Sequence, residues 1–399
     1  MNIEFQRKVD RFFGTIICRV FSIFGRKKKA FFSETRPNKI LVILLSEMGS
    51  LALAHPMFCH IKKKYPGSSI SVLLFQQNKE FLDVLGVISS ENVITVSNTS
   101  ILKMVLTSIR AVFKIRRQKI DAVIDCELFS RISSIFSFMS GAAIMAGFHP
   151  HTQEGLYRGD FINRPVLYNP YVHISQQFLT MAEAIESDFI PTVKRKVPED
   201  GLELPLLELE EKKVADTQRK FEADFPGTTG KKLILIYPGG GLLPIRAWPI
   251  DNFCDTAKDF LKNGYAVGII GMEGDRALAG VISSRCENES CVDLTGYTKT
   301  VRELMVIFHF VSLLITNDGG PGHFAAMTPM PAITLYGPET PLLYGPLSKK
   351  SYNFYAGLSC SPCLTAYNHR NSPCDGDNLC LKYIRPEDVL MKAYEMLKA

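Results

Sequence analysis

The sequence predicts an α/β protein with two doubly wound parallel sheets. Apolar runs typical of buried strands alternate with helical stretches over residues 39–125, and the same alternation starts again at residue 233. Between the two halves, residues 190–205 are rich in proline and charged side chains, as interdomain linkers are. A chain of 399 residues is long enough for two or three domains, each with its own core.

These patterns divide the chain into five parts. They are a basic N-terminal segment (1–36), a first sheet domain (37–190), a linker (191–210), a second sheet domain (211–384) and a C-terminal helix (385–399). The first segment holds nine basic and three acidic side chains, which accounts for the whole net charge of +6. The remainder is neutral overall, so the composition does not indicate a nucleic-acid-binding protein.

Residues 3–25 are predicted to form a helix with an apolar side and a basic side. The apolar positions are Phe5, Val9, Phe12, Phe13, Ile16, Val20, Ile23 and Phe24. The other side carries Arg7, Lys8, Arg11, Arg19 and Ser22, and the basic run 26–29 follows. Such a helix is typical of segments that lie in the interface of an anionic membrane, and we expect this role. Docking on the protein's own body is the alternative.

Two other targeting interpretations are disfavoured. A signal peptide does not fit, because Arg19 interrupts the apolar region and no small-residue cleavage site follows. No apolar run reaches the ~20 residues of a membrane span. Ten cysteines scattered through a chain of this length favour a reducing cytosol over a disulfide scaffold.

In the first sheet domain, residues 39–45 form a predicted strand, 46–50 a turn and 51–64 a helix. Further strands are expected at 69–75, 93–96 and 122–125, and a helix at 101–118. Ligands of such sheets sit beyond the carboxyl ends of the strands. We therefore expect Glu47, Ser50, Cys126 and Glu127 to lie near a cleft.

In the second sheet domain, strands are predicted at 233–237, 266–271, 311–316 and 332–336. The third of these breaks at Asn317-Asp318-Gly319-Gly320, and Pro321-Gly322-His323 then lead into a helix. A helix N-terminus presents unpaired N–H groups, and glycines let a phosphate approach the backbone. A phosphate site is one interpretation of this turn, and an ordinary β–α turn is the other.

The same stretch carries a family resemblance. The pattern D-G-G-x-x-H-x-A-A, followed by a proline and a strand that ends L-Y-G-P-x-T-P, resembles glycosyltransferase family 9, the ADP-heptose:lipopolysaccharide heptosyltransferases and their relatives. The family usually has Ser or Thr where this chain has Gly319. Weaker similarity extends over nearly the whole chain after residue 36.

The resemblance implies a GT-B architecture, with two Rossmann-like domains facing across a cleft. It implies inverting transfer of a sugar, expected to be a heptose, from a nucleotide-diphosphate donor such as ADP-heptose. The acceptor would be the lipopolysaccharide core or another envelope glycolipid or oligosaccharide. No cofactor is expected, since no DxD carboxylate cluster accompanies the donor turn. The expected location is the cytoplasmic face of the bacterial inner membrane.

The resemblance also implies donor-site residues. Arg246, two residues before Trp248, matches the family's cation that offsets the charge of the departing diphosphate. Asp275 matches a carboxylate that binds the ribose, and Glu273 competes for that role. The other implied donor residues are Gly239, Gly240, Thr295, Gly296, Asp318, Gly319, Gly320, Gly322 and His323.

On the acceptor side the chain departs from the family. The family's first turn usually ends in an Asp that acts as the catalytic base, and Ser50 stands at that position. A serine cannot act alone as a general base at neutral pH. We therefore hypothesise that Glu47 replaces the Asp; a role in capping or solvating the turn is the alternative. Arg158 and Arg164, in the loop-rich stretch 147–171, would suit an acidic acceptor, unless that stretch is an ordinary solvated loop.

A catalytically impaired relative that only binds a nucleotide or an envelope partner would also explain the missing Asp, whereas a nucleotide-sugar epimerase lacks a second acid/base set. Four cysteines near the C-terminus, spaced C-x2-C-x10-C-x5-C, are a weak candidate for a structural zinc site, and free thiols are the alternative. They are Cys360, Cys363, Cys374 and Cys380.

Overall fold

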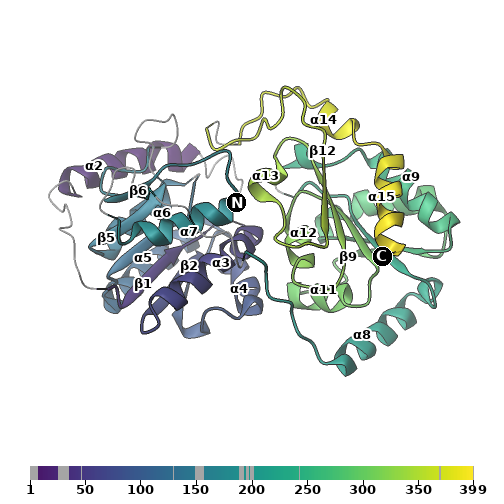
Figure 1. The fold of residues 1–399 in the computed structure, drawn as a ribbon, viewed down its shortest axis with the longest axis horizontal. Helices are drawn as coiled ribbons and strands as arrows, with labels where there is room; N and C mark the ends of the chain where they lie inside the picture. The colour runs from purple at the N-terminus through teal and green to yellow at the C-terminus, as the bar shows by residue number, and fades with distance from the viewer. Residues whose placement is uncertain are drawn as a thin grey trace. The chain divides into compact units, whose positions relative to one another are not determined.

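The computed structural model describes residues 8–25, 36–45, 47–128, 130–148, 157–187, 193–194, 197, 202–241, 243–367 and 370–398. The chain divides into two compact units (Figure 1). Unit 1 comprises residues 1–202 together with the short segment Ala366–Arg370, and unit 2 comprises Glu203–Thr365 and Asn371–Ala399. Each unit is an α/β sheet domain, so the two predicted Rossmann-like domains are confirmed.

The sheet of unit 1 is parallel, in the order β3-β2-β1-β4-β5-β6. Its strands are β1 (Lys39–Ile43), β2 (Ser69–Phe75), β3 (Val93–Val96), β4 (Ala122–Asp125), β5 (Ile144–Phe148) and β6 (Arg164–Val166). The main helices are α2 (Thr15–Gly25), α3 (Met48–Lys64), α4 (Lys79–Leu85), α5 (Ile101–Gln118), α6 (Arg131–Ser140) and α7 (Ile174–Ala184). Strand β1 is buried from Ile40 to Ile43 because helices cover both faces of the sheet.

The strand order reverses between β1 and β4. From β1 the chain steps outward to β2 and β3, then returns through α5 to β4 and continues to β5. Right-handed crossovers therefore place α5 and α6 on one face and α3 and α4 on the other. The carboxyl ends of β1 and β4 meet at this reversal, which is the usual place for a ligand in such a sheet. Glu47 and Glu127 follow these two strands, as the sequence predicted.

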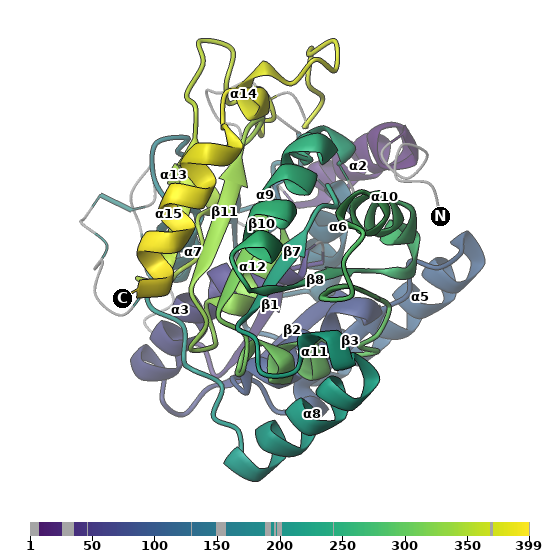
Figure 2. The same cartoon turned by 90° about the vertical axis from the view of Figure 1, so that its right-hand side faces the viewer.

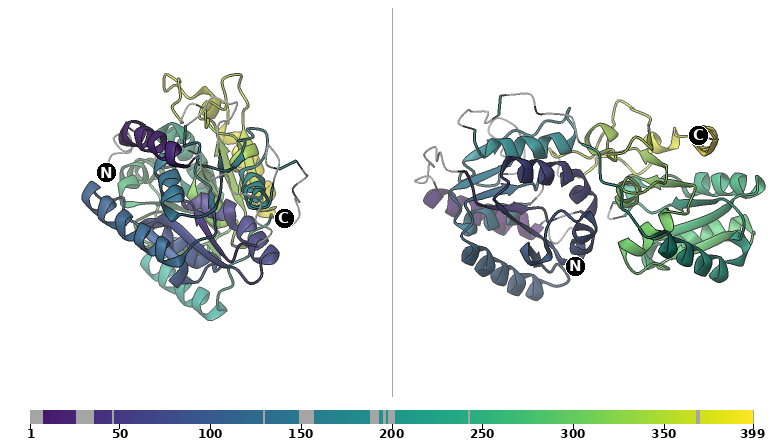
Figure 3. Two further views of the ribbon diagram at one scale, coloured as in Figure 1. Left: turned by 90° about the vertical axis from the view of Figure 1, so that its left-hand side faces the viewer. Right: turned by 60° about the horizontal axis from the view of Figure 1, so that its bottom comes forward.

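The N-terminal helical segment belongs to unit 1 and lies against α6 (Figures 1 and 3). It consists of the π-helical turn Asp10–Gly14 followed by α2. The side that faces the body carries small residues, namely Gly14, Cys18, Ser22 and Gly25. A Cβ atom on Gly25 would lie 2.6 Å from Cβ of Phe161, so a larger side chain there would push the helix away. Docking on the body, the alternative left open by the sequence, is therefore confirmed for this side.

Polar contacts fix the docked helix. The Asp10 carboxylate accepts hydrogen bonds from the backbone N–H groups of Arg131 (2.9 Å) and Ile132 (3.0 Å), so it caps the N-terminus of α6. Ser22, expected on the solvent side, is instead buried; its hydroxyl pairs with Tyr157 Oη (2.8 Å) and accepts from the backbone N–H of Asp160 (2.8 Å). The basic run 26–29 lies outside the described residues.

The sheet of unit 2 is also parallel, in the order β12-β11-β10-β7-β8-β9 (Figure 2). Its strands are β7 (Leu233–Tyr237), β8 (Ala266–Gly271), β9 (Cys291–Thr295), β10 (Leu313–Asn317), β11 (Ala332–Tyr336) and β12 (Ser351–Tyr355). Its helices are α8 (Glu211–Asp224), α9 (Ile250–Lys262), α10 (Arg276–Cys286), α11 (Val301–Phe308), α12 (Gly320–Ala325), α13 (Pro341–Tyr344), α14 (Leu379–Lys382) and α15 (Pro386–Lys398). Here the order reverses between β7 and β10, and the glycine turns predicted at 238–241 and 318–322 follow those two strands.

Some elements gave no usable signal in the sequence. Strand β12 lies at the sheet edge and is only partly buried, so it lacks an apolar run. Strand β6 is a short segment inside the stretch predicted to be loop-rich. A search of the described part of the chain finds no helix long and apolar enough to cross a membrane.

Candidate functional site

A buried cluster of charged side chains stands at the carboxyl end of β10. Arg246 is only 6% exposed, and it ends the short 3-10 helix Pro244–Arg246. Its Nη2 lies 2.9 Å from Glu339 Oε2, and its Nε lies 3.6 Å from Asp318 Oδ2. Both carboxylates are buried as well. The structure thus brings the predicted Arg246 and Asp318 together, and it adds Glu339, which sequence reasoning missed.

The two carboxylates also influence a neighbouring phenol. Burial, followed by the charges of Asp318 and Glu339, raises the pKa of Tyr336 well above its usual value. The Tyr336 hydroxyl donates to the backbone oxygen of Tyr344 at 3.0 Å. Glu339 itself follows β11 within the L-Y-G-P-E-T-P run, and its position after a buried strand was the signal that could have identified it.

Asn317, the last residue of β10, connects the parts of this site. Its side-chain Nδ2 donates to the backbone oxygens of Pro238 (3.0 Å) and Gly239 (3.1 Å), in the turn after β7. Its Oδ1 accepts from the backbone N–H of Trp248 at 3.0 Å. The buried indole of Trp248 donates to the backbone oxygen of Ile384 at 2.9 Å. One amide therefore fixes both the glycine turn and the segment that carries Arg246.

The glycine turn after β10 lets α12 pack closely on the sheet. A Cβ atom on Gly322 would lie 3.1 Å from Thr334 Oγ1 of β11, and one on Gly320 would lie 3.1 Å from the Phe324 ring. His323, in the first turns of α12, is buried. Gly319 has extended backbone angles, and a Cβ atom there would come no closer than 3.9 Å to its neighbours, so the turn itself does not require glycine at this position. The predicted strand–turn–helix–strand order is confirmed here.

A second group of predicted donor residues gathers around the turn after β7. A Cβ atom on Gly239 would lie 2.9 Å from Asp275 Oδ1 and 2.9 Å from the Tyr237 hydroxyl oxygen. Asp275 Oδ2 accepts a hydrogen bond from the backbone N–H of Met272 at 2.9 Å. Burial, followed by the charge of Asp275, raises the pKa of Tyr237 to about 12. The Asp275 carboxylate is therefore a fixed anion beside Gly239.

The D-L-T-G segment, which ends β9 and begins the turn after it, is fixed by its own side chains. The backbone N–H and the hydroxyl of Thr295 both donate to Asp293 Oδ1, at 2.8 and 2.7 Å. Gly296 has a φ of +68°, a conformation that favours glycine, and a Cβ atom there would lie 2.8 Å from Cγ of Glu273. Glu273 thus borders the D-L-T-G turn while Asp275 borders the Gly239 turn, so both remain candidates for the ribose hydroxyls.

In unit 1, Glu47 immediately precedes α3 and forms an ion pair that the sequence did not indicate. Its Oε1 lies 2.7 Å from Nη1 of Arg370, and both side chains are partly buried. Arg370 belongs to the segment Ala366–Arg370, which packs with unit 1, and Tyr367 of that segment contacts Tyr168 ring to ring at 5.7 Å. Ser50 lies in the first turn of α3, where its backbone N–H donates to the Glu47 oxygen at 3.1 Å.

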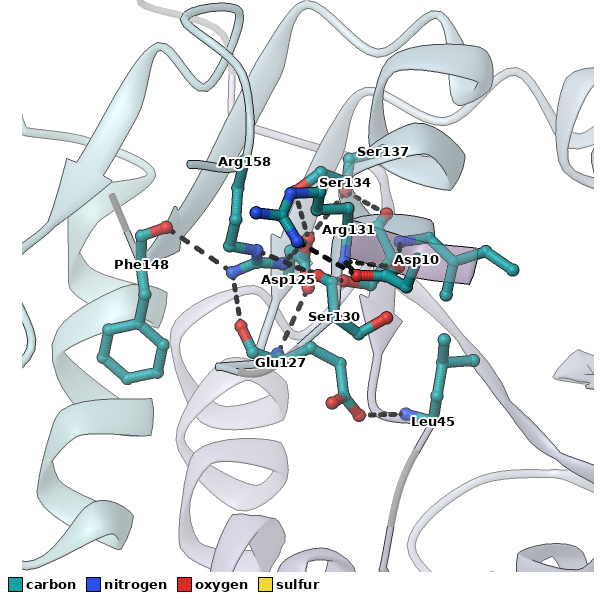
Figure 4. Close-up of polar contacts among 12 residues, drawn as sticks. Asp10, Leu45, Asp125, Glu127, Ser130, Arg131, Ser134, Ser137, Phe148 and Arg158 are labelled. Atoms are coloured by element: carbon teal, nitrogen blue, oxygen red, sulfur yellow. Dashed lines mark hydrogen bonds and ion pairs between the residues drawn. The ribbon is translucent and has the colours of Figure 1, made fainter. Parts of the chain in front are cut away.

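Arg158 lies inside unit 1 rather than on a surface (Figure 4). Its guanidinium pairs with Asp125 at the end of β4, and both side chains are 1% exposed. It also donates to the hydroxyl of Ser133 (2.8 Å) and to the backbone oxygen of Ser130 (3.2 Å). The expectation that Arg158 faces an acceptor is not met, because its donors are used within the unit. Arg164 opens β6 and donates to the backbone oxygen of Asn163 at 3.1 Å.

The same network holds the end of β4 against the end of β1. Glu127 is buried, its backbone N–H donates to Asp125 Oδ1 (3.2 Å), and its Oε1 accepts from the backbone N–H of Leu45 (2.6 Å) (Figure 4). The buried thiol of Cys126 lies 3.9 Å from the sulfur of Met57 in α3, and burial, followed by the charges of Asp125 and Glu127, raises its pKa well above the usual value. These residues therefore shape the turn that carries Glu47.

The described residues around the C-terminal cysteines do not form a metal-binding group. Among the residues that the structure describes, no group of three or more His, Cys, Asp or Glu side chains could hold a metal ion. Cys363 accepts from the Ser372 hydroxyl at 3.0 Å, and Cys374 lies beside Asn378. Cys380 is buried under Gly337.

Comparison with known proteins agrees with this arrangement. The model of glycosyltransferase family 9 (heptosyltransferase) matches residues 109–372. Lipooligosaccharide heptosyltransferase 2 of Haemophilus ducreyi is 24% identical over 319 residues, which is 78% of this chain and 87% of the relative. Lipopolysaccharide heptosyltransferase 3 of Escherichia coli is 23% identical over 363 residues, which is 88% of this chain and 95% of the relative.

Solved structures share the fold. The ADP-heptose lipopolysaccharide heptosyltransferase II of E. coli superposes with a TM-score of 0.69 at 19% identity, covering 90% of this chain and 98% of that one. The E. coli heptosyltransferase WaaC with ADP gives a TM-score of 0.59 at 14% identity, covering 89% and 99%. The family model covers well over half of the chain, including the Arg246 cluster and the turn after β10. The chain therefore belongs to glycosyltransferase family 9, the heptosyltransferase family.

Proposed function

We propose that this glycosyltransferase transfers a heptose from a nucleoside-diphosphate donor, with ADP-heptose as the expected form, to the lipopolysaccharide core or a related envelope glycolipid. The observation that carries the proposal is the buried Arg246, held by Asp318 and Glu339 next to the glycine turn after β10. A guanidinium fixed by two carboxylates offers an oriented cation for a diphosphate.

On the donor side, protein groups would stabilise the negative charge that develops during the reaction. As the bond between the anomeric carbon and the diphosphate oxygen breaks, negative charge develops on the leaving diphosphate. Arg246 would stabilise that charge, with Gly320, Gly322 and His323 of the turn offering backbone and imidazole donors. Because the cation is already held in place, little reorganisation is needed during the reaction. Asp275 or Glu273 would accept hydrogen bonds from the ribose hydroxyls, and Thr295 and Gly296 would border the base.

The acceptor side needs a base. In an inverting reaction this base takes the proton of the acceptor hydroxyl while the oxygen attacks the anomeric carbon. Glu47 is our candidate, and its ion pair with Arg370 would set the orientation of the carboxylate. Arg164 remains the proposed acceptor-binding cation. Arg158 would not contact the acceptor; it would hold the carboxyl end of β4 in place through its ion pair with Asp125.

The test is a transfer assay with purified protein, ADP-heptose and truncated lipopolysaccharide core. Mass spectrometry should show addition of one heptose, and NMR should show inversion at its anomeric carbon. UDP-glucose and GDP-mannose serve as donor controls. Loss of one heptose from the envelope glycolipid when the gene is removed would agree with the assay. Failure to transfer from any donor on the panel would contradict the proposal.

We expect Glu47→Gln to lower kcat by roughly a hundredfold or more, because a general base contributes factors of this size, while KM for the donor stays unchanged. Arg370→Gln and Ser50→Ala are the matched controls, since they remove the ion-pair partner and the family-position side chain. If Glu47 served only to hold Arg370, Glu47→Gln and Arg370→Gln would have equal effects on kcat and on stability. Equal effects would show that Glu47 is not the general base.

The second candidate function is a catalytically impaired relative that binds a nucleotide without transferring a sugar. The observation in its favour is that Ser50 replaces the family's Asp while Glu47 is engaged by Arg370. Isothermal titration with ADP, run beside the transfer assay, separates the two functions. Binding of ADP without transfer over the donor and acceptor panel would favour the impaired relative.

We also propose that the protein attaches to an anionic membrane surface through α2. Together with the π-helical turn that precedes it, α2 leaves large apolar side chains exposed at 57–70%: Phe12 and Phe13 of the turn, and Ile23 and Phe24 of α2. Lys8, Arg11 and Arg19 are exposed on the same segment. Apolar side chains beside cations are the combination that binds an anionic lipid interface. This placement would hold the enzyme at the cytoplasmic face of the inner membrane, where its glycolipid acceptor lies.

We expect the double variant Phe12→Gln/Phe24→Gln to bind vesicles of phosphatidylglycerol and phosphatidylcholine about tenfold more weakly. Point variants are preferable to deletion of residues 1–33, because deletion would also remove the contacts of Asp10 and Ser22 with the body. Met391→Gln on α15 is the control, since Met391 is 69% exposed in unit 2. Unchanged vesicle sedimentation of the double variant would contradict attachment through α2.

A further inference from the structure

Helix α5 carries an exposed apolar stripe that the fold does not explain. Its body-facing side consists of Ala111 and Ile115, which are buried in the core under α6. On the opposite side, large apolar residues are exposed by 47–70%, where a helix on a domain surface normally carries polar groups. These residues are Ile101, Leu102, Val105, Leu106, Ile109 and Phe113.

The spacing makes the stripe continuous. Successive residues of an α-helix turn by about 100°, so Ile101, Val105, Ile109 and Phe113, four apart, follow one side of the helix. Leu102 and Leu106 widen that side. Single exposed apolar residues are normal, but a contiguous row over more than three turns indicates an interaction surface.

The charge beside the stripe indicates what the surface contacts. Residues 97–120 contain six basic side chains and no acidic one. Lys103, Arg110 and Arg117 are exposed, and their positions place them together along one edge of the stripe. Lys114 instead donates to the backbone oxygens of Glu91 and Val93. An apolar stripe with a row of cations along one edge complements an anionic lipid interface, whereas a second copy of the same helix would bring like charges together.

The stripe lies on the same side of unit 1 as α2. Helix α6 packs against both α2 and α5. Cys18 of α2 and Ile115 of α5 belong to one core cluster beneath these helices. The two exposed apolar surfaces therefore flank α6 on one face of the sheet, and a lipid surface could contact both.

We infer that α5 is a second membrane-contact element, which binds anionic phospholipid jointly with α2. Two contacts on a rigid unit fix its orientation on the membrane, while α2 alone would leave it free to rotate. The inference rests on the proposed attachment through α2, and it adds a surface that the N-terminal segment does not contain. The ligand class is a bilayer rich in anionic phospholipid.

The test is sedimentation of the full chain with vesicles of phosphatidylglycerol and phosphatidylcholine (30:70), in 0.1 M salt. The variant Leu102→Gln/Leu106→Gln/Phe113→Gln should bind at least about tenfold more weakly than the native chain, because membrane affinity scales with buried apolar area. Arg110→Gln/Arg117→Gln should weaken binding to these vesicles and leave the weak binding to pure phosphatidylcholine unchanged. The controls are Met391→Gln for the apolar changes and Lys212→Gln/Lys220→Gln on α8 for the charges. Unchanged circular dichroism and thermal midpoint show that the α5 variants are folded.

Three outcomes would overturn the inference. If Phe12→Gln/Phe24→Gln loses binding while both α5 variants bind like the native chain, the N-terminal segment attaches the protein to the membrane and α5 does not. If the native chain itself does not bind anionic vesicles, both membrane proposals, for α2 and for α5, are wrong. The transfer assay in solution tests the glycosyltransferase function independently of this result. If sedimentation equilibrium shows a dimer that the triple α5 variant dissociates, the stripe is covered by a second copy of the chain.

Discussion

Replacing Arg246 with methionine is expected to slow transfer severely and to destabilise unit 2. The guanidinium is the buried cation next to the proposed diphosphate, so its loss should lower kcat by about a hundredfold to a thousandfold. It also compensates two buried carboxylates, Glu339 at 2.9 Å and Asp318 at 3.6 Å. Removing one partner of a buried ion pair costs about 3–5 kcal/mol of stability. Steady-state kinetics and denaturation by urea measure the two effects.

Two further variants separate the effect on catalysis from the effect on stability. Arg246→Met leaves the buried carboxylates of Asp318 and Glu339 without their cation. Arg246→Met/Glu339→Gln removes one of these two charges, so it should recover part of the stability but none of the activity. Arg285→Met is the matched control, because Arg285 is a half-exposed arginine of unit 2 that pairs with Asp251. Solvent screens an exposed ion pair of this kind, so Arg285→Met should leave the stability of unit 2 nearly unchanged. Recovery of turnover in the Arg246→Met/Glu339→Gln variant would show that Arg246 acts only as a structural counter-ion.

Replacing Arg158 with methionine is expected to be the most damaging single change to unit 1. Asp125 would remain fully buried without its cation, and Ser130 and Ser133 would lose the hydrogen bonds that Arg158 donates. The expected loss is about 3–5 kcal/mol in the free energy of unfolding of this unit. Hydrogen exchange at the amides of β1 and β4 measures that loss locally, without assuming that the two units unfold together.

Two comparison variants separate the loss of the buried ion pair from the loss of an arginine side chain in general. Asp125→Asn/Arg158→Met removes both charges and should be more stable than Arg158→Met alone. Arg219→Met removes an exposed arginine from the surface of α8 and should change stability by less than about 1 kcal/mol. If Arg158→Met left amide protection in β1 and β4 unchanged while raising KM for the acceptor, Arg158 would be a binding residue after all.

The sequence determined the architecture because the architecture depends on local patterns. Runs of buried aliphatic residues and the helices between them predicted most strands of both sheets, including β10 and β11 around the glycine turn. Helix α5 has the bounds that its sequence predicted, Ile101–Gln118. Short or half-exposed strands such as β6 and β12 were missed because they carry no such run.

The placement of the Arg246 cluster and the glycine turns was largely predictable for a related reason. Arg246, Asp318 and the glycines stand directly after buried strands, and parallel strands end at one edge of their sheet. The family pattern then gave each of them an expected role. Glu339 also follows a strand, yet only its 2.9 Å contact with Arg246 reveals that it holds the cation.

Only the tertiary structure decided which charged groups face each other across long stretches of chain. Arg158, predicted to bind an acceptor, is buried against Asp125, and Glu47 pairs with Arg370, which is 323 positions away in the sequence. The N-terminal helix has a third side, of small residues, that docks on α6 and leaves its aromatic side exposed. Sequence periodicity gives the faces of a helix, but the partner of each face is set by packing between distant segments, which no local pattern encodes.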